Sequence, residues 1–370
     1  MRIAIDVRKI NDFGIGTYLR NLIRHLPRLD SDNEYYLLCF RRDEELLRSL
    51  SSGFRLSFVK AQNYSLSEHV TIPVTLKRIR AELYHAPHYV LPYLTPCRSV
   101  VTVHDVIHLL FPQYLPSRFA IHYAKHMIGR ALERAELVMT VSKASKRDLL
   151  GFFDVEENKI RVIPNGIDPA MTRELDVDEV DRVKQRFQLQ GRNALFVGNI
   201  KPHKNVERLI GAFAKLREDP QFSDVTLILV GDEISKYPAL RRAVARHKLR
   251  ANVRFFGFVP ELTLVALYRS ADVFVFPSLY EGFGLPPLEA MANGTPVITS
   301  KISSLPEVVG DAALTVDPYN IDEIAEAMQS IFVDPVLRER LIKKGRIRAE
   351  LFSWEEAVSQ IHATYMAALS

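Results

Sequence analysis

Short apolar runs alternate with amphipathic segments along most of the chain, in two successive series. A short apolar run fits a buried strand, and apolar residues three and four apart fit a helix that covers the strand. This alternation is typical of parallel sheets with helices on both faces. The expected strands are Arg2–Asp6, Tyr35–Phe40, Arg55–Val59, Ser99–Val103, Leu137–Val141 and Arg161–Ile163 in the first series, and Ala194–Val197, Thr226–Val230, Val253–Phe256, Val273–Phe276 and Pro296–Thr299 in the second.

The length of the chain favours two domains. A single hydrophobic core stops growing at roughly 250–300 residues, and this chain has 370 residues, of which 47% are hydrophobic. The turn-forming residues 164–168 and the charged stretch 173–186 place the boundary between them. We therefore expect two doubly wound α/β domains, residues 1–168 and 192–352, joined by a linker at 169–191. A last helix over 353–370 begins at a capping box formed by Ser353 and Glu356.

The composition gives evidence on the cellular location of the protein and argues against disulfide bonds and metal sites. Cys39 and Cys97 are the only cysteines, too few for a disulfide framework, and neither has metal-ligand spacing with the other. Asp6 interrupts the apolar run that a signal peptide needs, and no segment approaches the roughly 20 apolar residues of a membrane span. These observations predict a cytoplasmic protein with no metal site.

The positive charge is concentrated in the first half. Residues 1–170 contain 24 lysines and arginines against 18 acidic residues, whereas the remainder contains 25 against 26. The clusters are Arg20, Arg24 and Arg28; Lys77, Arg78 and Arg80; and Lys143, Lys146 and Arg147. They fit either solvated helix faces or peripheral docking on the anionic inner face of a membrane. Because they lack interleaved aromatic residues, they do not indicate nucleic-acid binding.

The most informative motif is EGFGLPPLEAMANGTPVI, residues 281–298. Pro286 and Pro287 suit the first helical positions, and Gly294 suits the residue after the helix ends. The start of this helix offers the unpaired backbone N–H groups of three residues, which make an anion site: Phe283, Gly284 and Leu285. The two carboxylates that flank the site, Glu281 and Glu289, therefore fit hydroxyl groups rather than phosphate, one on a sugar ring and one on a ribose.

Other candidate site residues follow expected strands, where ligands bind in open α/β sheets. Gly14 and Gly16 precede a helix expected to be capped by Thr17 and fit either a phosphate loop or a simple turn. His104 and Asp105 follow a strand directly, so His104 is either a buried structural histidine or a residue that orients substrate. His85, His88 and His108 have no companion at metal spacing.

The second series of expected strands and helices adds two lysines to the candidate site residues. Lys201 and Lys204 follow its first strand, before a helix that we expect Asn205 to cap. Cations at this point suit a diphosphate leaving group, although solvated loop lysines are the alternative interpretation. Gly257, Phe258 and Val259 follow a later strand, where backbone groups could contact a base.

Taken together, these motifs resemble glycosyltransferase family 4. They occur in the family's order across nearly the whole chain: GIGTYLRNL, VHD, TVSKASKRDL, IPNGID, GNIKPHKN, the glycine-containing segment 257–260 and the motif at 281–298. The resemblance implies the GT-B fold, in which two Rossmann-like domains face each other across a cleft and the C-terminal helix crosses back to the first. It implies a retaining, nucleotide-sugar-dependent transferase whose first domain binds the acceptor and whose second binds the donor.

The resemblance also implies roles for single residues. Glu281 would contact hydroxyls of the transferred sugar, Glu289 would hold the ribose, and Lys204 would neutralise the diphosphate, so that no metal or other cofactor is needed. His104 would lie near the reacting carbon and Gly16 would cover the phosphates. Donor contacts would further come from Gly14, Asn199, Lys201, Gly257, Phe258, Val259, Gly282, Phe283, Gly284 and Leu285.

The chain departs from the family pattern at two positions. Asn199 stands where many members carry arginine, and His203 stands where a subgroup carries it, which leaves Lys201 as the candidate second cation. The resemblance is greatest to bacterial enzymes that transfer mannose to lipid-linked or saccharide acceptors, which indicates GDP-mannose as donor. UDP-glucose and dTDP-rhamnose stay open as donors. A nucleotide-sugar epimerase and a catalytically idle nucleotide-sugar-binding subunit stay open as functions.

Overall fold

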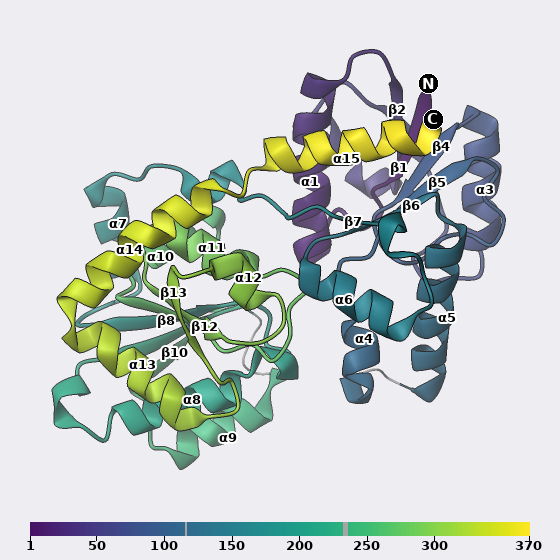
Figure 1. Cartoon of the computed structure of the whole chain (residues 1–370). Coiled ribbons are helices and arrows are strands. Elements are labelled where there is room, and N and C mark those ends of the chain that lie inside the picture. Colours follow the sequence, from purple (N-terminus) through teal and green to yellow (C-terminus); the bar gives the residue numbers. More distant parts are fainter. Residues whose placement is uncertain (115–116, 232–235) are drawn as a thin grey trace. The chain divides into compact units, whose positions relative to one another are not determined.

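The computed structural model describes residues 1–114, 117–231 and 236–370, and it divides into two compact units (Figure 1). The first unit comprises Met1–Gly166 and Ser353–Ser370, and the second comprises Ile167–Phe352. Each unit contains one sheet whose paired strands all run parallel. This arrangement confirms the α/β prediction. The segment 169–191, expected as a linker, forms η4 (Pro169–Thr172) and α7 (Val177–Arg186) and lies in the second unit.

The sheet of the first unit has the strand order β3-β2-β1-β4-β5-β6-β7. Six of its seven strands coincide with expected runs, and the unexpected one is β4, whose sequence is LYHA. Tyr84 and His85 break the apolar pattern, but both are buried and hydrogen-bonded, Tyr84 to Asp6 and His85 to Thr102. The strands are β1 (Arg2–Asp6), β2 (Glu34–Cys39), β3 (Arg55–Phe58), β4 (Leu83–Ala86), β5 (Arg98–Thr102), β6 (Leu137–Thr140) and β7 (Ile160–Val162).

The last helix of the chain belongs to the core of the first unit. Its buried face, which includes Trp354, Val358 and Ile361, packs with Leu19 and Leu22 of α1. Tyr365 also donates to or accepts from His85 Nδ1 at 2.7 Å. The helices of this unit are α1 (Phe13–Leu29), α2 (Glu44–Leu50), α3 (Glu68–Ile79), α4 (Ile107–Leu110), α5 (Arg118–Arg134), α6 (Lys143–Phe152) and α15 (Trp354–Leu369), with short 3₁₀ helices η1 (Arg41–Asp43), η2 (Pro112–Tyr114) and η3 (Glu157–Lys159).

The sheet of the second unit has the order β10-β9-β8-β11-β12-β13. Its unexpected strand, β13, has the sequence ALTV and lies at the sheet edge, where only Val316 of its four residues is buried. The strands are β8 (Asn193–Val197), β9 (Thr226–Val230), β10 (Val253–Phe255), β11 (Val273–Phe276), β12 (Val297–Ser300) and β13 (Ala313–Val316). The helices are α8 (Val206–Leu216), α9 (Pro238–Arg246), α10 (Glu261–Ser270), α11 (Leu285–Ala292), α12 (Leu305–Val309), α13 (Ile321–Val333) and α14 (Pro335–Glu350), with η5 (Pro202–Lys204) and η6 (Pro220–Phe222).

Strand order reverses once in each sheet, between β1 and β4 in the first and between β8 and β11 in the second. At such a reversal, the loops that follow the two neighbouring strands run to opposite faces of the sheet. They leave a crevice at the carboxyl edge of the sheet, where ligands bind in this class of fold. No helix in the described ranges combines the length and the apolar composition that spanning a bilayer requires.

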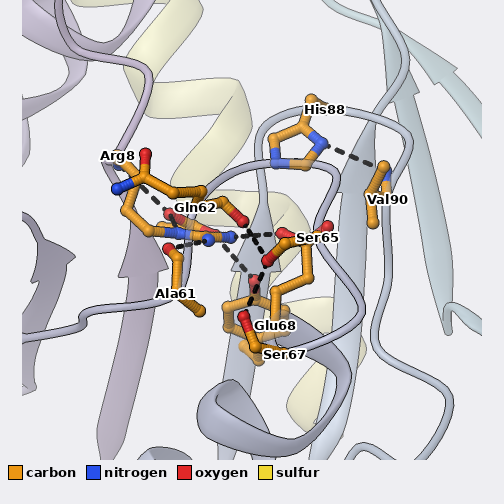
Figure 2. A network of polar contacts seen from close by, with 10 residues as sticks. Arg8, Ala61, Gln62, Ser65, Ser67, Glu68, His88 and Val90 are labelled. Atoms are coloured by element: carbon orange, nitrogen blue, oxygen red, sulfur yellow. Dashed lines mark hydrogen bonds and ion pairs between the residues drawn. The ribbon is translucent and has the colours of Figure 1, made fainter.

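A buried charge network lies at the reversal point of the first sheet (Figure 2). Arg8 follows β1, and its guanidinium donates to Asp6 at 2.6 Å, to Glu68 at 2.9 Å and to the carbonyl of Ala61 at 3.0 Å. The three charged side chains are almost fully buried. Burial alone would raise the pKa of Asp6, but the adjoining guanidinium lowers it below its usual range. The network therefore fixes the loop before α3 to the end of β1.

We predict that R8M lowers the free energy of unfolding by about 3–5 kcal/mol at pH 7, because it leaves two buried carboxylates without their cation. Denaturant unfolding monitored by circular dichroism measures the change. The control is R41M, which removes an exposed arginine that pairs with Glu44 at 3.3 Å and should shift stability by less than about 1 kcal/mol. Equal effects of the two substitutions would show that the network contributes no more than a surface pair.

Candidate functional site

Lys204 and Glu281 meet at the reversal point of the second sheet. Lys204 lies in η5 after β8, and Glu281 lies in the loop after β11. The lysine Nζ is 2.6 Å from Glu281 Oε1 and 2.8 Å from Oε2, and each side chain is only 12% exposed. The lysine Nζ also lies 5.1 Å from the centre of the Phe276 ring. Two residues 77 positions apart in the sequence thus form one charged unit at the sheet's carboxyl edge.

Serine side chains fix the loop that carries Glu281. Ser278 Oγ donates to Glu281 Oε1 at 2.6 Å, and Ser303 Oγ donates to the Glu281 carbonyl at 2.8 Å. Ser304 Oγ donates to the carbonyl of Phe283 at 2.6 Å. Sequence reasoning missed these serines. The signal available was their position, since Ser303 and Ser304 follow β12 at the same edge of the sheet.

The loop leads into helix α11, whose start agrees with the sequence. Pro286 and Pro287 occupy its first turn, Gly284 precedes it with φ of +117°, and Gly294 follows its end with φ of +76°. Prolines have no N–H, so the donors at this helix start are the amides before them. Within the part of the chain that the structure describes, no group accepts from the amides of residues 283–285. Together with the helix dipole these donors form an anion site.

Glu289 lies on α11 in an environment unlike that of Glu281. Its Oε2 accepts a hydrogen bond from the hydroxyl of Tyr268 on α10 at 2.9 Å. Burial raises the pKa of Glu289 to about 7, and the nearby carboxylates of Asp168 and Glu261 act in the same direction. Near neutral pH this carboxyl group therefore exists as a mixture of acid and carboxylate.

His104 follows β5 in the first unit. Its Nε2 lies 3.0 Å from the carbonyl oxygen of Pro87, which can only accept, so Nε2 carries the hydrogen and Nδ1 is the acceptor. Its ring lies edge-on to Tyr18 with 5.0 Å between the ring centres. Burial lowers the pKa of His104 to about 4, so the imidazole is neutral at physiological pH. Such a group can accept a hydrogen bond from a sugar hydroxyl.

Gly14 and Gly16 lie inside helix α1 rather than in a loop before it. The helix begins at Phe13 with Asp12 as its N-cap, so the expected cap at Thr17 is wrong. The Gly16 amide donates to the Asp12 carbonyl at 2.6 Å, and a Cβ at Gly16 would lie 2.4 Å from the Ile10 carbonyl oxygen. Close packing against Ile10 therefore requires a glycine there. Contacts of these two glycines with phosphate stay a prediction.

The remaining candidates differ in accessibility. Lys201 is exposed, whereas Asn199 has a buried Oδ1 with no partner among the described residues. Asn205 precedes α8 as expected, but its side chain donates to the Pro277 and Pro318 carbonyls instead of capping the helix. After β10, Gly257 has φ of +55° and Phe258 is exposed, whereas Val259 is buried.

Hydrogen bonds join Lys204 to Glu281 and connect Glu281 through Ser304 to the segment 282–285. Across the residues that the structure describes, no such contact connects Lys201 or the segment 257–259 to this group. Among the described residues, no three His, Cys, Asp or Glu side chains gather closely enough to hold a metal ion. Metal independence stays a prediction.

The two parallel-sheet units, each with one reversal of strand order, have the architecture of the GT-B fold. The structure of sucrose-phosphate synthase from Thermosynechococcus elongatus superposes with a TM-score of 0.80 at 22% identity, covering 99% of this chain and 98% of that one. The model of the family Glyco_transf_4, Glycosyltransferase Family 4, matches residues 14–171, and that of Glycosyl transferases group 1 matches residues 177–348.

Sequence relatives agree with these matches. The O-antigen chain mannosyltransferase B of Escherichia coli is 30% identical over 368 residues, which cover 99% of this chain and 92% of that protein. The MMP alpha-(1->4)-mannosyltransferase of Mycolicibacterium hassiacum is 34% identical over 248 residues, 66% of this chain and 57% of that protein. The chain therefore belongs to glycosyltransferase family 4.

The raised pKa of Glu289 predicts a pH-dependent stability. Unfolding restores an ordinary carboxyl pKa, so the ionised group destabilises the fold progressively as pH rises from about 4.5 to 7. We expect the unfolding free energy of the wild type, relative to E289Q, to fall by about 2–3 kcal/mol between pH 5 and pH 8. Denaturant unfolding at both pH values measures this difference. A wild type that gains stability relative to E289Q over this range would contradict the assignment.

Proposed function

We propose that this glycosyltransferase is a retaining enzyme that moves a hexose, mannose from GDP-mannose, onto a lipid-linked or saccharide acceptor in the synthesis of a cell-surface polysaccharide. In this proposal Lys204 and the amides of residues 283–285 bind the diphosphate. Glu281 binds hydroxyls of the sugar, and Glu289 binds the ribose. His104 accepts a hydrogen bond from the sugar or the acceptor through Nδ1.

The observation that carries the proposal is the pairing of Lys204 with Glu281 beside the start of α11. A cation and a set of unpartnered backbone donors occur together at the point where a leaving diphosphate needs charge neutralisation. A sugar joined to that diphosphate would lie beside the Glu281 carboxylate. An ordinary structural ion pair would explain neither the unpartnered amides nor their position at the reversal of strand order.

The proposed chemical step forms one bond and breaks one. The acceptor hydroxyl oxygen attacks the anomeric carbon as the bond from that carbon to the diphosphate oxygen breaks. The hydroxyl proton passes to an oxygen of the departing phosphate, so the enzyme need not supply a base. Lys204 and the helix start stabilise the charge that develops on the diphosphate.

The surroundings of Glu281 support retention through attack on the face that the leaving group vacates. A double displacement needs a carboxylate that is free to attack the anomeric carbon. Both oxygens of Glu281 are already hydrogen-bonded, Oε1 to Lys204 and Ser278 and Oε2 to Lys204. These bonds suit a group that orients hydroxyls better than a nucleophile.

The choice of mannose is supported by the relatives. The full-length relative from E. coli and the partial relative from M. hassiacum are both mannosyltransferases by name. The name of the E. coli relative also refers to the O-antigen chain, which supports a cell-surface polysaccharide as the product. The proposed location is the cytoplasm, at the inner face of the membrane where a lipid-linked acceptor would be reached.

We predict that K204M and E281Q each lower kcat by roughly 10²–10³, because each removes a group that acts on developing charge or on the reacting sugar. Initial rates of nucleotide diphosphate release at saturating donor measure this loss. K215M is the matched control, since Lys215 pairs with Asp322 on the surface of the same unit. Near-wild-type turnover in K204M, or an equal loss in K215M, would refute the role of Lys204.

Release of nucleotide diphosphate from GDP-mannose, UDP-glucose and dTDP-rhamnose tests the donor assignment. We expect transfer with GDP-mannose, a product that keeps the donor's anomeric configuration, and a rise in melting temperature with GDP that K204M weakens. A different donor in the panel would reassign the sugar, and an inverted product would overturn retention. Epimerisation of the donor without an acceptor would identify an epimerase. Thermal protection without any turnover would identify an idle binding subunit.

A further inference from the structure

Helix α3 exposes a row of aliphatic side chains. Leu66, Val70 and Val74 are four residues apart and therefore lie along one side of the helix and its preceding turn. Each of them is between 62% and 84% exposed. The row continues into the exposed cations Lys77 and Arg78 at the end of the helix. The acidic residue of this helix, Glu68, is buried against Arg8 and places no charge on the surface.

The exposed apolar surface extends from α3 to α5 through the loop at Tyr93 and Leu94. Tyr93 lies with its ring centre 4.6 Å from that of His69 on α3, and its hydroxyl lies 3.2 Å from His126 Nε2 on α5. The guanidinium of Arg130 on α5 lies over the Tyr93 ring at 4.5 Å. Leu94 is 78% exposed and Phe119, in the first turn of α5, is 79% exposed. These side-chain contacts connect α3 with α5.

We call this the α3–α5 surface and define it by five exposed apolar residues and four cations: Leu66, Val70, Val74, Leu94, Phe119, Lys77, Arg78, Lys125 and Arg130. The charge of this surface is predominantly positive. Residues 62–130 contain seven lysines and arginines but three acidic residues, and one of those three is the buried Glu68. Of the three basic clusters in the sequence, the cluster at Lys77 is thus the one that continues a row of exposed aliphatic side chains.

We infer that the α3–α5 surface docks on an anionic membrane. Exposed aliphatic and aromatic side chains enter the headgroup region, and the flanking cations contact lipid phosphates, the combination that binds peripheral proteins to acidic bilayers. A second copy of the chain fits the surface less well, because a symmetric contact would bring cations against cations. The anionic bilayer is complementary in both charge and polarity.

This inference rests on the proposed function and selects between its two acceptor classes. Helices α3 and α5 each precede a strand that runs parallel to its neighbours, so their first turns lie at the carboxyl edge of the sheet. Leu66 and Phe119 are at these first turns, and His104 follows β5 at the same edge. A membrane bound to the α3–α5 surface would therefore lie beside the carboxyl edge of the sheet, at which His104 is located. A lipid-linked acceptor in that membrane would be presented to His104.

Vesicle flotation with purified protein tests the inference without catalysis. We expect the wild type to bind vesicles of phosphatidylcholine with phosphatidylglycerol, but not phosphatidylcholine alone, and to dissociate at high salt. K77E/R78E and V70E/V74E should each lower the partition coefficient at least about tenfold, since each surface cation contributes about fivefold. The matched controls, R241E/R242E and V333E/V336E, change exposed residues of the second unit and should bind as the wild type does.

The activity readout is the rate of nucleotide diphosphate release from the nucleotide sugar in the absence of vesicles. All four variants should retain the wild-type rate, so that a failure of the proposed function shows in this rate and a failure of docking shows in flotation. Absence of wild-type binding to anionic vesicles, or equal losses in the control variants, would overturn the inference. It would also be overturned if size-exclusion chromatography showed a dimer that V70E/V74E dissociates, because the surface would then bind a second copy.

Discussion

The ion pair between Lys204 and Glu281 connects the fold to the chemistry of this enzyme. It exists because β8 and β11 are neighbours at the single reversal of strand order, so their following loops meet at one edge. Each of these two charges has little solvent exposure, so each is stabilised by the other. Either charge alone would carry a large desolvation cost. In the proposed function, the diphosphate of the donor would bind the lysine and hydroxyl groups of the sugar would bind the carboxylate, so that the donor would replace each partner of the pair.

The two glutamates of the same motif, Glu281 and Glu289, have different surroundings. Glu281 is surrounded by donors, namely Lys204 and Ser278, which suit a carboxylate. Glu289 has one donor, Tyr268, and two carboxylates nearby, and burial raises its pKa to about 7. A neutral acid can donate to a ribose oxygen, whereas a carboxylate accepts from a ribose hydroxyl. In the proposed function, Glu289 could therefore bind the ribose in either protonation state.

Local signals in the sequence were sufficient where a residue's own backbone decides the structure. Pro286, Pro287 and Gly294 bounded α11 because proline and glycine restrict or release φ at fixed helix positions. The same reasoning failed at Gly14 and Gly16, which lie inside α1 and not in a loop, and at Gly16 close packing on Ile10 explains the glycine. It also missed β4, whose polar residues are buried through partners distant in sequence, and the serines at 278, 303 and 304, whose contacts exist only after β11 and β12 pair. What depends on contacts between distant segments could not be read from local patterns.

The chain passes from the first unit to the second after Gly166 and returns after Phe352, so the first unit is built from two separated segments. The core of that unit lacks Trp354, Val358, Ile361 and Tyr365 until the whole second unit has been synthesised. On the ribosome, therefore, the second unit can complete its core while the first still exposes the apolar groove that α15 will fill. The last helix acts as a closing element for synthesis: a chain that stops short of it leaves Leu19, Leu22 and their neighbours uncovered, and such a chain is prone to aggregate.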